Sequence, residues 1–152
     1  MIVVANGRAG EKPNCVNACV DCLDRIRSGA ELLHLDSLGL ILEEYGRQCQ
    51  YGTPRGVGDV FVVWASTHRA TLAKCETVSI QEDSEWEFAE FPHDDALRAF
   101  DRSDRKFVAV AIASGVNPVI YNATDSDWSD FAVPLAKYVA VVELCAGDER
   151  AD

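Results

Sequence analysis

Residues 104–128, DRKFVAVAIASGVNPVIYNATDSDW, say more about the fold than any other part of the chain. The stretch begins with Asp104, which is followed by an apolar run of helical spacing that Gly115 ends. The run 117–121 predicts a buried strand, and the polar turn 124–127 leads into a further helix. A helix, a strand and a helix in direct succession are typical of α/β proteins.

The same alternation extends to both sides of this stretch. We expect strands over residues 1–5, 31–36, 76–80 and 138–144, and helices over 15–26, 37–50, 59–73 and 128–138, with Pro134 interrupting the last one. Residues 81–95 predict a loop with a short helical turn, before a short helix that ends at Phe100. Strands that alternate with helices form a parallel sheet with helices on both faces, so the predicted fold class is α/β.

The length of 152 residues suits one domain, which we place at residues 1–145, with a flexible C-terminal tail at 146–152. An apolar content of 48% is enough for a real core. No apolar run approaches the roughly 18 residues of a membrane span, and no signal peptide is visible. We therefore expect no membrane association, a cytoplasmic location, and six cysteines that are thiols.

The net charge of -11 is unevenly distributed along the chain. Residues 1–75 hold eight acids and eight bases, whereas residues 76–152 hold 17 acids and six bases. This excess argues against a broad basic face for nucleic acid. It leaves open a local cluster of carboxylates that holds a divalent cation.

Candidate ligands follow from the rule that parallel sheets bind ligands at the carboxyl ends of their strands. Acidic or amide residues lie near such ends or on neighbouring helices at Asn6, Glu43, Glu44, Asp104, Asp125 and Asp127. Carboxylates that come together from separate elements repel one another unless a cation or protons neutralise them. Their hard oxygen atoms suit Mg²⁺ or Mn²⁺.

Four segments carry a resemblance to a known family. They are MIVVAN (1–6), LGLILEEYG (38–46), DRKFVAVAIA (104–113) and VIYNATDSDW (119–128), with 21 residues between Asp104 and Asp125. In this order the chain resembles the PIN-domain family of metal-dependent ribonucleases, which includes toxins of toxin–antitoxin pairs. The resemblance implies a single-domain α/β/α sandwich with a parallel sheet.

The resemblance also implies a site. Glu43 (or Glu44), Asp104, Asp125 and Asp127 would bind Mg²⁺ or Mn²⁺, and the ion would activate water against an RNA phosphodiester. RNA would be the substrate, with room for an antitoxin-like protein partner and for a homodimer. Asn6 stands where the family has its first catalytic acid. Because an amide brings no negative charge, a catalytically weak or inactive interaction module is the alternative.

Simpler explanations exist for each group of residues. Acids at helix starts and turns serve as caps, and a glutamate on a helix is usually solvated. Arg8, Lys12, Arg102, Arg105 and Lys106 could form a cationic rim for RNA or could pair along helix faces. Trp86, Phe88, Phe91 and Trp128 could stack on bases or fill the core.

Two further motifs have structural explanations that we prefer. Cys15, Cys19 and Cys22 match the spacing of a radical-SAM iron–sulfur motif, but the same spacing puts three small apolar side chains on one helix face. The chain is also too short for the barrel of that family. The glycine-rich stretch 52–58 lacks the Gly-Lys-Ser/Thr of a phosphate loop and predicts a flexible connection.

Overall fold

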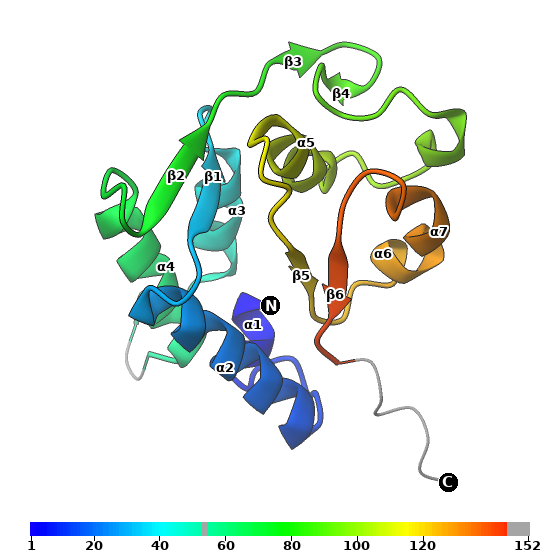
Figure 1. Cartoon of the computed structure of the whole chain (residues 1–152). Coiled ribbons are helices and arrows are strands. Elements are labelled where there is room, and N and C mark those ends of the chain that lie inside the picture. The colour runs from blue at the N-terminus through cyan, green and yellow to red at the C-terminus, as the bar shows by residue number, and fades with distance from the viewer. Residues whose placement is uncertain (53–54, 146–152) are drawn as a thin grey trace, which may run out of the picture.

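The structure is a computed structural model, and it describes residues 1–52 and 55–145 (Figure 1). The predicted tail at 146–152, and Thr53 and Pro54 of the glycine-rich stretch, lie outside the described residues. The elements in chain order are α1 (Ile2–Ala5), α2 (Pro13–Ser28), β1 (Leu33–Asp36), α3 (Leu40–Gln48), α4 (Val57–His68), β2 (Cys75–Val78), β3 (Glu82–Asp83), β4 (Glu87–Phe88), the 3-10 helix η1 (Asp95–Leu97), α5 (Arg105–Ala113), β5 (Ile120–Asn122), α6 (Ser126–Asp130), α7 (Ala132–Leu135) and β6 (Val141–Glu143).

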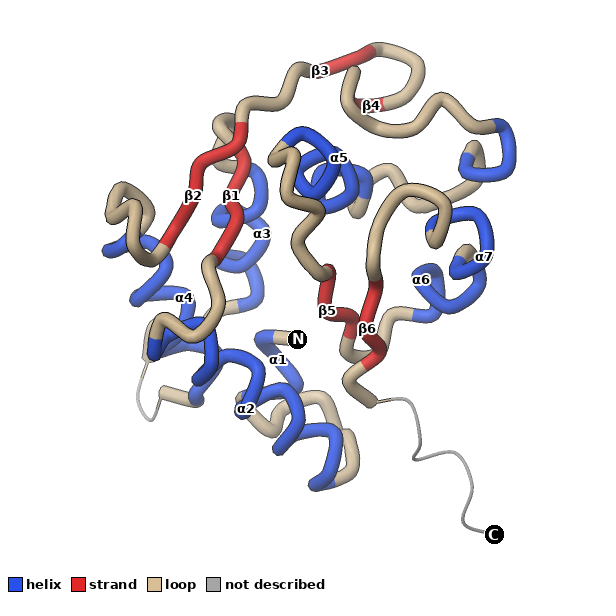
Figure 2. The backbone as a smooth tube through the Cα atoms, in the orientation of Figure 1, coloured by secondary structure: helices blue, strands red, loops and turns tan. Residues whose placement is uncertain are grey.

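The four longer strands form two separate parallel pairs. β1 pairs with β2, with Leu33 opposite Cys75, and β5 pairs with β6, with Ile120 opposite Val141. Helix α5 contacts both β1 and β5 and lies between the two pairs (Figures 1 and 2). The α/β class and the parallel pairing were predicted correctly, but the described strands do not join into one continuous sheet.

The prediction of a strand at residues 1–5 is wrong, because these residues form the helix α1. Ile2, Val4 and Ala5 are buried, and α1 contacts α2 and α4. A β carbon at Gly58 would lie 2.3 Å from the backbone oxygen of Ile2, so this close approach requires glycine. Gly58 is therefore part of a packed helix contact. A short apolar run fits a buried helix as well as a buried strand, and periodicity cannot separate them.

Segment 81–100 also differs from the prediction. β3 and β4 form a two-residue antiparallel ladder, and the Asp83 carboxylate accepts hydrogen bonds from the backbone of Glu85 (2.9 Å) and Trp86 (2.7 Å). The predicted helix at 93–100 is only the short η1. Trp86, Phe88, Phe91 and Trp128 are buried, so these aromatic side chains belong to the core.

The cysteines of α2 lie in the core, as the helical spacing predicted. Cys15, Cys19 and Cys22 are all buried. The expectation of six thiols is wrong for one pair, because Cys15 and Cys145 form a disulfide with their Cα atoms 4.8 Å apart. The pair is separated by 130 residues, and only the fold brings the start of α2 to the end of β6. Of the described helices, none has the length and apolar character needed to cross a bilayer.

Candidate functional site

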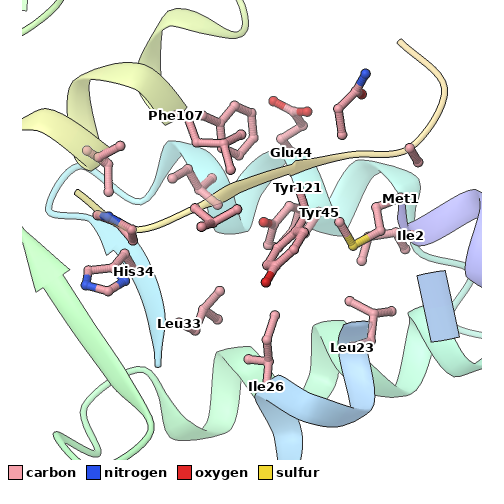
Figure 3. A pocket seen from close by; sticks show the side chains of 18 of the residues that line it. Met1, Ile2, Leu23, Ile26, Leu33, His34, Glu44, Tyr45, Phe107 and Tyr121 are labelled. Carbon is pink, nitrogen blue, oxygen red and sulfur yellow. The ribbon is translucent and has the colours of Figure 1, made fainter. Parts of the chain in front are cut away.

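A cavity of about 530 Å³ lies between the two strand pairs (Figure 3). Leu33 and His34 of β1 and Ile120–Asn122 of β5 contribute to its wall, with apolar side chains of α2, α3 and α5. The carboxylate of Glu31, which pairs with Arg25, lines it, and so do three others, those of Glu44, Asp104 and Asp125. A cavity of this size with a few polar groups is typical of a ligand-binding site.

Three different elements supply these carboxylates. Glu44 lies in α3, on the helix face that also carries the buried Ile41. Asp104 is the N-cap of α5 and Asp125 is the N-cap of α6, where the Asp125 carboxylate accepts a hydrogen bond of 3.0 Å from the backbone N–H of Asp127. Capping therefore fixes the position of Asp125, although capping does not exclude a second role for its free oxygen.

Asp104 is the buried member of the three, with 8% of its surface exposed. Burial is the largest cause that raises its pKa to about 7, and the carboxylates of Asp125, Glu44 and Asp101 add to the increase. Lys106 opposes the increase without cancelling it. The charged form of Asp104 is thus held among other carboxylates with too little compensating positive charge.

Two cationic groups of the chain lie near these carboxylates. Lys106 is buried and forms an ion pair with Glu44. Burial lowers the pKa of the α-amino group of Met1, and Cys19, Glu44 and Asp125 oppose this decrease, so the group is also close to these carboxylates. In Figure 3 Met1 and Glu44 lie at the same end of the cavity.

The three carboxylates do not yet form a tight ligand set. Of the described residues, the group of three or more metal-binding side chains with ligand atoms within 4.8 Å of one another consists of Cys15, Cys19 and Cys145. Two of those cysteines are already joined in the disulfide. An ion bound by Glu44, Asp104 and Asp125 together must therefore draw their oxygens closer or bind some of them through water.

Asn6 is not among the residues that line the cavity. Its side chain donates to Asp59 Oδ1 (2.9 Å) and accepts from the Asp59 backbone N–H (3.1 Å). Asp59 is fully buried, forms an ion pair with Arg8, and accepts backbone N–H groups of Gln50 and Gly56. The structure gives Asn6 a structural partner, apart from the carboxylates that we predicted it would join.

The other predicted residues divide between the cavity and the surface. Glu43 is exposed and pairs with Arg47, so of the two glutamates Glu44 faces the cavity. Asp127 does not line the cavity and contributes its backbone N–H to Asp125. Of the predicted cationic rim, Lys106 pairs with Glu44, whereas Arg102 pairs with Glu87. Arg105 is buried and donates to backbone carbonyls, including that of Arg98 (2.8 Å).

Sequence reasoning passed over two polar residues of this region. Asn122 lines the cavity and donates to the backbone oxygen of Asp125 (2.7 Å) and to Glu143 (2.7 Å), which connects β5 to α6 and β6. Asp36 ends β1, and its two oxygens accept the backbone N–H groups of Leu40 and Ile41 at 2.8 Å. The location of Asp36 between a strand and a helix was visible in the sequence and marked it as a candidate site residue. In the structure its carboxylate instead accepts hydrogen bonds from the first turn of α3.

Among known proteins, no family model, no curated protein and no solved structure matches the chain.

Proposed function

We propose that this protein is a divalent-metal-dependent endoribonuclease with a PIN-like α/β/α fold. The observation that carries the proposal is the convergence of Glu44, Asp104 and Asp125 on one cavity from three separate elements. Asp104 is buried, Glu44 is partly buried and Asp125 is exposed. A buried carboxylate next to two others costs free energy unless a cation compensates, and such sites are typical of function. The order of the acids along the chain is that of the resembled family.

The donor set fits Mg²⁺ or Mn²⁺. All three side chains offer hard carboxylate oxygens, and burial and then the neighbouring carboxylates raise the pKa of Asp104. When bound, the ion supplies an activated water and stabilises the charge that develops on the phosphate. Three protein carboxylates and open space in the cavity are compatible with that role.

The chain's own residues have separate tasks in this proposal. Glu44, Asp104 and Asp125 hold the ion, and Asn122 holds the Asp125 loop through its backbone oxygen. Burial and then the neighbouring carboxylates raise the pKa of Asp104 to about 7, so metal binding there would displace a proton and should weaken as the pH falls below neutral. Lys106, which pairs with Glu44, would be a further positive charge next to an ion held by these carboxylates.

The test is Mn²⁺-dependent cleavage of single-stranded RNA by the wild type, Asp104→Asn and Asp101→Asn. Asp101 is a matched control, because it lies one turn earlier and uses its carboxylate to cap Ser103 (2.7 Å). We expect cleavage to fall by at least a hundredfold in Asp104→Asn and to persist in Asp101→Asn. Equal cleavage by Asp104→Asn and wild type would exclude the assignment.

A second candidate is a catalytically silent interaction module. It is favoured by the Lys106–Glu44 ion pair, which already neutralises one of the three carboxylates, and by the location of Asn6 outside the cavity lining. Calorimetric titration with Mn²⁺ separates the two functions. Saturable binding that disappears in Asp104→Asn supports the enzyme, whereas no heat at millimolar Mn²⁺ supports the silent module.

A further inference from the structure

The cavity separates two strand edges that have no strand partner among the described residues. β1 pairs with β2 on one side and β5 pairs with β6 on one side, and the sheets they form have two strands each. Residues of both β1 and β5 line the cavity. In Figure 2, β1 and β5 are the inner strands of their pairs, on the sides that face each other. We call the space between these edges the slot.

The register shows which backbone groups face the slot. Leu33 donates its N–H to Lys74 (3.0 Å), so the odd-numbered residues of β1 bond to β2 and His34 points its N–H and C=O the other way. Ile120 donates to Ala140 (2.9 Å) and Asn122 accepts from Leu144 (2.8 Å), which leaves the N–H and C=O of Tyr121 facing away from β6. Both His34 and Tyr121 line the cavity.

Backbone amides that face an apolar cavity need partners. An unpaired buried N–H or C=O costs free energy comparable to a lost hydrogen bond, and the walls around these groups include Leu33, Ile41 and Phe107. A rounded apolar ligand would fill the volume but leave these amides unsatisfied. An extended peptide satisfies both edges at once, because its own N–H and C=O groups alternate to its two sides.

The charge of the cavity and the continuity of the two strand pairs further define the peptide that fits the slot. The apolar walls select apolar side chains in the middle of the peptide, while Glu44, Asp104 and Asp125 form an acidic region of the same cavity. A basic residue at one end of the peptide complements that region. A strand placed here would also continue the β2–β1 and β5–β6 ladders into one sheet.

We propose that the slot binds one extended apolar peptide strand with a basic residue at its end, supplied by a partner polypeptide. The strand completes the sheet between β1 and β5. This inference goes beyond the proposed nuclease. The free strand edges of β1 and β5 carry it, and only the basic end of the peptide would use Glu44, Asp104 and Asp125, the acids that the nuclease proposal assigns to the metal.

The test adds a heptapeptide of alternating valine and threonine, with lysine at both ends, to the whole protein. We expect saturating peptide to raise Tm by about 5–10 °C, and to slow amide hydrogen exchange of His34 and Tyr121 at least tenfold. The same peptide with a central proline should have no effect, because proline cannot donate and breaks the ladder. No change with either peptide would overturn the proposal.

A pair of variants tests the register. Tyr121→Pro removes the slot-facing N–H and should abolish the peptide's effect on Tm, whereas Tyr121→Val keeps that N–H and should retain it. If Tyr121→Pro does not fold, the proline-containing peptide remains the deciding control.

A fusion of the same heptapeptide ahead of Met1 tests whether a partner supplies the strand. Stabilisation by the fusion alone, with none from free peptide, would overturn supply by a partner. Absence of RNA cleavage by the wild-type protein would contradict the proposed nuclease and would leave the peptide proposal unchanged.

Discussion

Two buried aspartates of this protein have opposite surroundings. Asp59 is fully buried, yet it receives Arg8, the Asn6 side chain and the backbone N–H groups of Gln50 and Gly56. Burial raises its pKa, but these hydrogen bonds outweigh burial and hold the pKa well below its ordinary value. Asp104 is almost as buried, but it has carboxylates for neighbours, and its pKa is raised to about 7.

This contrast separates a structural acid from the acid that we propose as a metal ligand. The chain satisfies Asp59 completely with its own groups, so Asp59 contributes to stability and has no oxygen left for a ligand. The carboxylate of Asp104 has too little positive charge around it. This shortage lowers the stability of the fold and favours the binding of a cation. Position in the sequence does not distinguish them, since both stand in the first turn or at the cap of an apolar helix.

The strongest effect is predicted for the structural acid. Asp59→Asn leaves the Arg8 guanidinium without its counter-charge, and it should lower the free energy of unfolding by about 3–5 kcal/mol. Urea denaturation measures this value at neutral pH. A loss below about 1 kcal/mol would mean that the protein does not compensate Asp59 better than Asp104.

The second prediction concerns Asp104, where the change in stability has the opposite sign. Asp104→Asn should raise the free energy of unfolding by about 1–4 kcal/mol at pH 8, since each pKa unit corresponds to about 1.36 kcal/mol. The pKa of Asp104 is higher in the folded protein than in the unfolded chain. The resulting contribution to stability is fully present at pH values below the pKa of the unfolded chain, and it is lost as pH rises through about 7. The gain of the variant should therefore vanish near pH 4. Denaturation curves at both pH values provide the check, and an equal gain at both would rule out the charge of Asp104 as its cause.

The third prediction concerns a variant that introduces a second acid next to Asp59. In Asn6→Asp the side chain can no longer donate to Asp59, and two carboxylates face each other at a distance that now holds a hydrogen bond of 2.9 Å. We expect a loss of about 1–3 kcal/mol in the free energy of unfolding. Calorimetry should show unchanged Mn²⁺ affinity. Stronger Mn²⁺ binding in this variant would instead assign Asn6 to the metal site.

The smallest effect distinguishes two adjacent glutamates. Glu44→Gln removes a carboxylate from the cavity and should weaken Mn²⁺ binding about tenfold, or about 1.4 kcal/mol. Glu43→Gln is the matched control, because Glu43 is exposed and pairs only with Arg47 among the ion pairs of the described residues. Its Mn²⁺ affinity should stay at the wild-type value. The reverse order of the two variants would move the site to the other face of α3.

Local patterns were enough for several parts of this protein. The spacing of Cys15, Cys19 and Cys22 predicted the buried face of α2, and the acid–apolar run after Asp104 predicted α5. The α/β class followed from the alternation of elements, because periods of two and 3.6 residues are properties of neighbouring positions. Asp104 and Asp125 were also singled out from sequence, and the structure places both at one cavity.

The remaining features depend on tertiary contacts, because these contacts join distant positions. The helix at residues 2–5 packs against Gly58, and the side chain of Asn6 bonds to Asp59, 53 residues away. The choice of Glu44 over Glu43 depended on which face of α3 meets the cavity. Local sequence thus determined which segments are helices and strands over most of the chain and which acids were candidates. Packing determined which of those acids the protein neutralises itself and which it leaves short of positive charge, since the free energy of a buried charge depends on everything around it.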